Sequence, residues 1–178
     1  MTSAIRSSVF VGTSLDGFIA RPNGDFDFLA PWEGEEHGYH AFMATVDTIV
    51  MGRNTYEKVL TFDDWPYGST PVVVLSSRPI GMPADRSASV EHMAGTPKDI
   101  VSRLAARGAT HLYVDGGITV QRFLREGLIQ RLIITRVPVL IGAGIPLFGV
   151  VPRDIRLDHI ATREYPSGMV QSEYTVAT

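Results

Sequence analysis

The chain has no cysteine among its 178 residues. This absence excludes disulfides, a thiol nucleophile and cysteine-ligated metals, and it fits a cytoplasmic protein. Net charge is also small, at -3 with a pI near 5.9, which argues against broad binding to nucleic acids or anionic membranes. No apolar run approaches membrane length, and the N-terminus is too short and polar for a signal sequence. We therefore expect a cytoplasmic protein without nucleic-acid or membrane partners.

Length and composition predict one folded domain over residues 1–178. A hydrophobic content of 44% and a charged content of 20% are typical of a chain that buries a sizeable core. The sequence shows no internal repeat, low-complexity segment or linker. A division into two domains is therefore not expected.

Short apolar runs alternate with segments of helical periodicity along most of the chain, which predicts an α/β fold with a mostly parallel sheet. Strands are expected at residues 5–13, 48–51, 71–75, 89–93, 111–115 and 129–139. Helices are expected at residues 35–46, 54–60, 96–108 and 118–126, and a loop at 21–32. Residues 155–165 and 169–176 flank a Pro-Ser-Gly turn, which predicts an antiparallel hairpin at the C-terminal edge of the sheet.

One stretch stands out as a possible phosphate site. The buried strand at residues 48–51 runs into Gly52, and a helix then opens with Arg53, Asn54 and Thr55. Glycine permits a sharp bend, the first helix amides lack partners, and an arginine can hold a phosphate through two hydrogen bonds. The alternative is an ordinary strand-to-helix turn whose arginine points to water.

Two further strands end in similar chemistry. Serine hydroxyls and an arginine follow the strand at residues 71–75, and two glycines follow the strand at 111–115. Ligands of open α/β sheets bind at the carboxyl ends of the strands, so we expect these turns to form one nucleotide site. The residues assigned to it are Gly52, Arg53, Asn54, Thr55, Ser76, Ser77, Arg78, Gly116, Gly117, Ile118 and Thr119.

In this order, the three turns resemble the dihydrofolate reductase fold. The closer resemblance is to its riboflavin-biosynthesis branch, the C-terminal reductase domain of the bifunctional deaminase-reductase. It rests on Ser14-Leu15-Asp16-Gly17 and on the segment at residues 138–148, and it covers about residues 4–176. The resemblance implies a three-layer dihydrofolate reductase-like fold, here as a stand-alone domain without the deaminase half.

The same resemblance implies NADPH as the cofactor. It places the diphosphate near the amides of Gly52 and Gly116-Gly117, and the adenosine 2'-phosphate near Arg53, Ser77 and Arg78. The residue types agree, because an acidic residue at that strand end would instead favour the ribose of NADH.

The resemblance also suggests two catalytic carboxylates. In dihydrofolate reductases a carboxylate on the first helix grips the pterin ring, and counting back from Gly52 without gaps leads to Glu36. In the riboflavin branch, the aspartate that matches Asp16 lies near the site. The alternative for Asp16 is a turn residue that bonds its own backbone.

Three residues are candidates for contact with the substrate. Trp32 could stack on a flat heterocycle or could pack in the loop. Gly142 and Gly144 are expected in a loop that lines the nicotinamide mouth, because Pro146 excludes an ordinary helix interior there. A plain glycine turn is the alternative for that loop.

A metal site is not expected. His37 and His40 share possible helical faces with Glu33 and Glu36, but a metal would need further ligands that the sequence does not mark.

The sequence therefore predicts an NADPH-dependent reductase of a small heterocycle. By resemblance the nearest activity is reduction of 5-amino-6-(5-phosphoribosylamino)uracil, whose phosphate would need a further cation such as Arg21, Arg136 or Arg163. The alternatives are a dihydrofolate or pterin reductase and a non-catalytic NADP(H)-binding protein. The resemblance also implies a homodimer, in which the strand at residues 129–139 could pair or pack across the two-fold axis.

Overall fold

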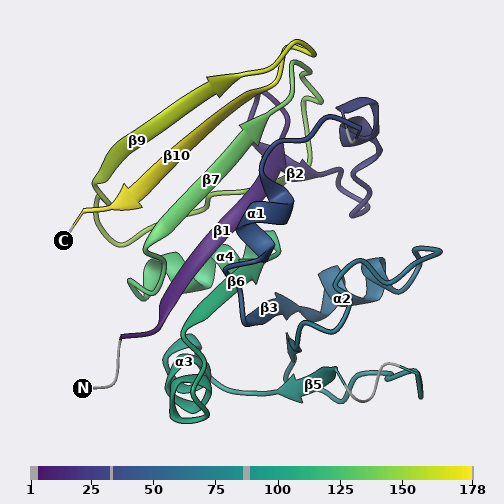
Figure 1. The fold of residues 1–178 in the computed structure, drawn as a ribbon, viewed down its shortest axis with the longest axis vertical. Helices are drawn as coiled ribbons and strands as arrows, with labels where there is room; N and C mark the ends of the chain where they lie inside the picture. The colour runs from purple at the N-terminus through teal and green to yellow at the C-terminus, as the bar shows by residue number, and fades with distance from the viewer. Residues whose placement is uncertain (1–3, 33, 86–88, 178) are drawn as a thin grey trace.

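The computed structural model describes residues 4–32, 34–85 and 89–177 and contains an eight-stranded sheet (Figure 1). The strand order is β5-β4-β3-β6-β1-β7-β10-β9. The strands are β1 (Arg6–Thr13), β3 (Thr48–Gly52), β4 (Val72–Leu75), β5 (Val90–Met93), β6 (His111–Asp115), β7 (Arg131–Arg136), β9 (Leu157–Glu164) and β10 (Val170–Val176). All neighbours from β5 to β7 are parallel, whereas β10 pairs antiparallel with β7 and with β9. The predicted parallel sheet with an antiparallel C-terminal hairpin is confirmed.

Helices cover both faces of the sheet. They are α1 (Tyr39–Met43), α2 (Arg53–Val59), α3 (Pro97–Ala106) and α4 (Gly117–Arg125), with a 3-10 helix η1 (Asp27–Trp32). Along β3, Ile49 and Met51 pack with α1 and α2, while Val50 packs with α3 and α4. This alternation follows from the two-residue period of a strand. It builds two hydrophobic layers on one sheet, and in Figure 1 α1 lies in front of the sheet and α4 behind it.

The start of α3 shows how local sequence fixes an element. The Thr96 hydroxyl accepts a hydrogen bond from the Asp99 amide at 3.2 Å, and the Asp99 carboxylate accepts one from the Thr96 amide at 3.1 Å. Pro97 occupies the first helical position, where a missing N–H costs nothing. Such a cap contributes about 1 kcal/mol to helix stability.

Two sequence-based expectations are wrong in extent. The helix expected at residues 35–46 is reduced to Tyr39–Met43, because Gly38 has a φ of 86° and the Glu36 carboxylate binds its amide in a turn. The strand expected at residues 129–139 ends at Arg136, and Pro138, just beyond, has no N–H to extend the pairing. The strand β7 also lies between β1 and β10, so both of its edges are paired within the chain. Pairing of this strand across a two-fold axis is therefore excluded, whereas packing across such an axis, and the homodimer itself, stay predictions.

A small second sheet was not expected from the sequence. The strands β2 (Phe18–Ala20) and β8 (Ile145–Pro146) pair antiparallel and join two segments that are far apart in the chain. None of the helices within the described residues is long and apolar enough to cross a membrane.

A buried histidine, His111, joins the start of β6 to β1 and to the turn before β3. The Nδ1 atom of His111 lies 2.8 Å from the Thr45 carbonyl oxygen, and its Nε2 lies 2.8 Å from the Ser8 hydroxyl. A neutral ring satisfies both contacts when Nδ1 donates to the carbonyl and Nε2 accepts from the hydroxyl. The Arg6 guanidinium, 3.2 Å from Nδ1, disfavours a positive charge on the ring. Burial lowers the pKa of His111 below its ordinary value, although the bond to Thr45 acts in the opposite direction.

We expect His111 to make stability fall with decreasing pH. The unfolded chain takes up a proton near pH 6.5 while the folded chain resists it, so the contribution is complete above that pH and is lost below it. Chemical denaturation of the wild type and of His111→Gln between pH 8 and pH 5 measures this effect. The variant should be less stable at pH 8 and should lose less stability on acidification; parallel pH curves would contradict the assignment.

Candidate functional site

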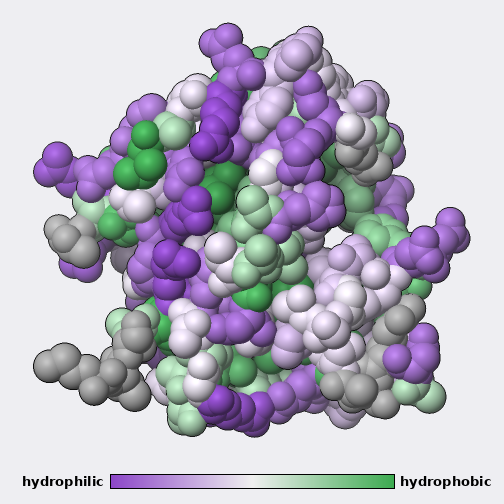
Figure 2. Space-filling model, viewed as in Figure 1, coloured by the Kyte–Doolittle hydropathy of each residue, from purple (hydrophilic) through white to green (hydrophobic). Residues whose placement is uncertain are grey.

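A cleft of about 700 Å³ lies at the carboxyl ends of β1, β3, β4 and β6. This volume is within the range of small-molecule and cofactor sites. In Figure 2 the surface is hollowed between the segment that carries η1 and the segment that carries α2. Every residue that the sequence assigned to the nucleotide site lines this cleft. The structure therefore brings together three turns that lie at residues 52–55, 76–78 and 116–119 of the chain.

Glycines allow two of these turns to interlock. A Cβ atom on Gly52 would lie 2.8 Å from the Thr119 hydroxyl oxygen, and one on Gly116 would lie 2.6 Å from that of Thr55. A Cβ on Gly117 would lie 2.9 Å from Ile19 Cδ1. A side chain at Gly52 or Gly116 would force the turns apart, and one at Gly117 would collide with β2 and β8. The result is a stretch of bare backbone at the floor of the cleft, where amides can approach a ligand closely.

The strand order sets the arrangement of the three turns. Because β4, β3 and β6 are neighbours, residues 76–78, 52–55 and 116–119 follow one another across the sheet. Strands are about 4.8 Å apart, so the row spans roughly 10 Å. Arg53 and Arg78 lie at its β3 and β4 end, and Arg53 has a distant contact of 3.7 Å with Glu57. The row can therefore accept an extended anion.

Beyond this row the cleft opens into a part that we call the apolar chamber. It lies on the face of the sheet covered by α2, between β1, β6, α2 and the segment after β2. Its wall residues are Phe10, Gly12, Phe26, Leu29, Lys58, Val59, Phe62, Tyr67, Tyr113 and Asp115. Flat aromatic and aliphatic walls of this kind suit a flat ring.

Asp115 is the acidic residue among these wall residues. It shares a face of β6 with Tyr113, and its carboxylate accepts a hydrogen bond from the Gly116 amide at 2.8 Å. Burial raises the pKa of Asp115 to about 6, against the opposing effect of that amide. A carboxyl that titrates near neutral pH can both hold and release a proton.

The charge of this carboxyl acts on three buried phenols. Burial raises the pKa of Tyr39 to about 12, and the charge of Asp115 adds to the effect. The same two causes, in the same order, raise the pKa of Tyr67 and of Tyr113. The Tyr113 hydroxyl donates to the Phe10 carbonyl at 3.0 Å, so this phenol is a fixed neutral wall rather than a proton carrier.

Sequence reasoning gave Asp115 no role. The signal that could have found it is its position: it is the last residue of a buried strand and directly precedes the two glycines of the nucleotide site. Side chains two residues apart on a strand lie on the same face, so Asp115 points to the same side of the sheet as Tyr113. Both residues line the cleft.

Asp16, expected to be catalytic, does not line the cleft. Its carboxylate accepts hydrogen bonds from the amides of Gly142 at 2.8 Å and Ile141 at 3.3 Å. The Ser14 hydroxyl and these amides lower the pKa of Asp16. Asp16 therefore fastens the segment after β1 to the loop before β8, outside the cleft lining.

The two glycines of that loop also lie outside the cleft lining. Gly142 has a φ of 77° and donates its amide to Asp16. Gly144 packs directly against the Ala20 carbonyl, leaving no room for a side chain. The neighbouring Ile145, the first residue of β8, does line the cleft.

Glu36 and Trp32 likewise contact other parts of the chain. The exposed Glu36 carboxylate accepts a hydrogen bond from the Gly38 amide at 2.8 Å. Trp32 donates its indole N–H to the Ser167 carbonyl at 3.1 Å and packs beside Met169. Neither residue lines the cleft. Within the described residues, which exclude Glu33, no cluster of His, Asp or Glu is arranged to hold a metal ion.

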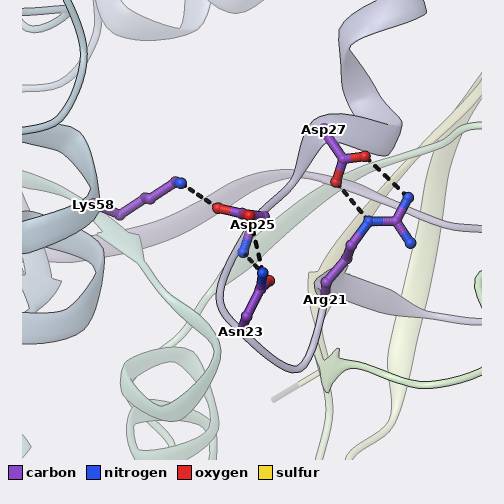
Figure 3. A network of polar contacts seen from close by, with 5 residues as sticks. All are labelled: Arg21, Asn23, Asp25, Asp27 and Lys58. Carbon is purple, nitrogen blue, oxygen red and sulfur yellow. Dashed lines mark hydrogen bonds and ion pairs between the residues drawn. The ribbon is translucent and has the colours of Figure 1, made fainter.

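Residues 21–29, which we call the strap, cross from β2 to α2 at the cleft mouth (Figure 3). The Lys58 ammonium donates to the Asp25 carboxylate, and this contact lowers the pKa of Asp25. The Phe26 ring meets the Phe62 ring edge-on, with 5.8 Å between centroids. Arg21, one of the cations considered for a substrate phosphate, is bound to Asp27 at 2.5 and 3.1 Å. Neither Arg136 nor Arg163 lines the cleft.

The sequence matches the RibD C-terminal domain family over residues 8–171. The chain belongs to this family. It is 33% identical to the uncharacterized protein YwjB of Bacillus subtilis, over 97% of this chain and 98% of that protein. A putative riboflavin biosynthesis protein from Shewanella sp. PV-4 superposes with a TM-score of 0.91 at 39% identity, covering 98% of this chain and 100% of that one.

The fold extends to dihydrofolate reductases. The enzyme from Enterococcus faecalis, complexed with NADP(H), superposes with a TM-score of 0.70 at 15% identity, covering 99% of each chain. The expected dihydrofolate reductase-like fold is confirmed, as is membership of the riboflavin-biosynthesis branch.

The raised pKa of Asp115 predicts a gain in stability when its charge is removed. The folded chain favours the protonated carboxyl, so an ionised Asp115 costs stability above pH 6, and this cost disappears below about pH 4. We expect Asp115→Asn to raise the free energy of unfolding by on the order of 2 kcal/mol at pH 8 and to leave it unchanged near pH 3.5. Denaturant titrations at both pH values give the two numbers.

Asp47→Asn is the matched control. Partial burial raises the pKa of Asp47, but hydrogen bonds from Thr110 and His111 outweigh it and leave the pKa lowered. This variant should therefore lose stability at pH 8. A loss of stability in Asp115→Asn at that pH would show that the carboxyl is not buried as described.

Proposed function

We propose that this protein is an NADPH-dependent reductase that transfers hydride to a small heterocyclic substrate. One observation carries the proposal: a row of glycine and cationic turns opens directly into an apolar chamber that holds a titratable carboxyl. Membership of the RibD C-terminal domain family supports reductase chemistry. The two parts of the cleft suit the two partners of a hydride transfer.

The residues of the row fit the cofactor. Bare backbone at Gly52, Gly116 and Gly117, where a Cβ would collide with neighbouring side chains, leaves room for a diphosphate, although the Gly116 amide itself is donated to Asp115. Arg53 and Arg78, with the Ser77 hydroxyl, offer a cationic and hydrogen-bonding group for a 2'-phosphate. When bound, NADPH supplies the hydride, and the protein must provide orientation and a proton.

The apolar chamber supplies both. Its aromatic and aliphatic walls exclude water and orient a flat ring. Asp115 is poised to hold a proton near neutral pH and can release it to the reduced substrate. In this proposal Asp115 performs the role that the sequence had suggested for Asp16 and Glu36.

Two substrate classes follow. Family membership favours 5-amino-6-(5-phosphoribosylamino)uracil, the activity that the sequence resemblance implied. A dihydrofolate or pterin is the second candidate, because a carboxyl in an apolar chamber can accept the N–H groups of such a ring. A chain that binds NADP(H) without turnover would need the same row of turns but would not need Asp115 as a proton donor.

Calorimetric titration with NADPH and NADH tests the cofactor. We expect NADPH to bind more tightly than NADH, and Arg53→Ala to weaken NADPH binding by about tenfold with a smaller effect on NADH. Arg163→Ala, which removes an arginine outside the cleft, is the control and should bind as the wild type does. Equal binding of both cofactors, or no binding of either, would count against the proposal.

Turnover separates the enzyme from the non-catalytic alternative. NADPH oxidation is followed with the phosphoribosylaminouracil, with dihydrofolate and with simple pterins, in the wild type and in Asp115→Asn. We expect oxidation with one of these compounds and a kcat at least tenfold lower in the variant. Cofactor binding without oxidation of NADPH by any of them would favour the non-catalytic alternative.

A further inference from the structure

The apolar chamber offers no uncommitted positive charge. Among its described wall residues, Lys58 is the cation and Asp115 the acid. Three other cations among the described residues line the cleft. Arg53 and Arg78 belong to the nucleotide turns, and Arg122 belongs to α4. Lys58 is therefore the cationic side chain on the chamber wall.

Lys58 is neutralised by the strap. Its ammonium donates to Asp25 Oδ1 and lies 5.9 Å from the centroid of the Phe26 ring. Figure 3 shows the side chains of Lys58, on α2, and Asp25, on the strap, pointing toward each other. A ligand that binds this ammonium must therefore compete with a carboxylate and an aromatic face.

The carboxylate of Asp25 is itself held in place. Asn23 donates from Nδ2 to Asp25 Oδ2 at 3.0 Å, and the Asp25 amide donates to Asn23 Oδ1 at 3.0 Å. The Arg21 amide donates to the Asp25 carbonyl at 2.7 Å. The tip of the strap is thus a hydrogen-bonded turn that presents its carboxylate to α2.

A phosphate in the chamber would meet unfavourable electrostatics. Binding it would require Lys58 to leave Asp25, and the exposed Asp25 carboxylate would then stand beside the phosphate. Asp115 adds an acid on the chamber wall. A neutral ring with N–H groups avoids this conflict, because it can donate hydrogen bonds to Asp115 and leave the ion pair intact.

We propose that this site takes a flat nitrogen heterocycle with N–H donors and no phosphate, and that Asp25 excludes phosphorylated substrates by neutralising Lys58. The proposal rests on the reductase function above and chooses within its substrate classes. Asp25 and Lys58 are then specificity determinants, and the strap is part of the substrate site.

A matched pair of ligands tests this proposal. The probes are 5-amino-6-(5-phosphoribosylamino)uracil and its dephosphorylated form, 5-amino-6-ribosylaminouracil. Both are titrated by calorimetry into protein saturated with NADP+, so that no turnover occurs. We expect the wild type to bind the dephosphorylated compound about tenfold more tightly.

Two variants assign the preference to the ion pair. Asp25→Asn keeps the shape of the side chain and frees Lys58, so it should reduce the preference by on the order of tenfold through tighter binding of the phosphorylated probe. Lys58→Met removes the cation and should keep or increase the preference for the dephosphorylated probe. Both positions are at the surface of the strap and α2, and circular dichroism checks that the variants are folded.

Three results would overturn the proposal. They are equal or tighter binding of the phosphorylated probe by the wild type, an unchanged preference in Asp25→Asn, and binding of neither probe by the NADP+ complex. Titration of NADP+ into the same samples comes first. Failure at that step would refute the reductase function itself, whereas NADP+ binding followed by any of the three results would refute the substrate class alone.

Discussion

The cleft depends on the close approach of two strand-to-helix turns. The hydroxyl of Thr119 occupies the place of a side chain on Gly52, and the hydroxyl of Thr55 occupies that place on Gly116. Because β3 and β6 are neighbours in the sheet, this contact aligns the starts of α2 and α4. It also leaves a floor of backbone amides between them. A methyl group at either glycine would separate the turns and alter the position of each cleft residue that they carry.

A second constraint is electrostatic. The chamber buries a carboxyl at a cost in stability that its single amide contact does not remove, since the pKa of Asp115 is raised to about 6. Residues that destabilise a folded chain in this way are typical of functional sites. The strap shows the opposite arrangement, because its carboxylates are matched by Lys58 and Arg21. The carboxyl without a matching cation, Asp115, therefore lies on the wall of the chamber where a substrate would contact it.

The parts of the fold that could be predicted are those fixed by neighbouring residues. The strand at His111–Asp115 and the capped start of α3 follow from an apolar run and from a Thr-Pro pair. The glycine turns could be predicted because bends between strands and helices have local signatures. The shortened α1 and the β2–β8 pair could not, since a turn at Gly38 and a contact between distant segments decide them. The ion pair of Asp25 and Lys58 joins residues 33 positions apart, with no pattern in the sequence to mark it.

This difference explains why the cofactor is easier to infer than the substrate. The nucleotide row is made mainly of backbone, so glycines and short motifs at the ends of successive strands indicate it in the sequence. The chamber is made of side chains from β1, β6, α2 and the strap, which only the folded chain brings together. Under our proposal, a change of one charge in the strap would alter the accepted substrate without disturbing the fold or the cofactor row. Substrate choice would then depend on the side chains of Asp25, Lys58 and Asp115.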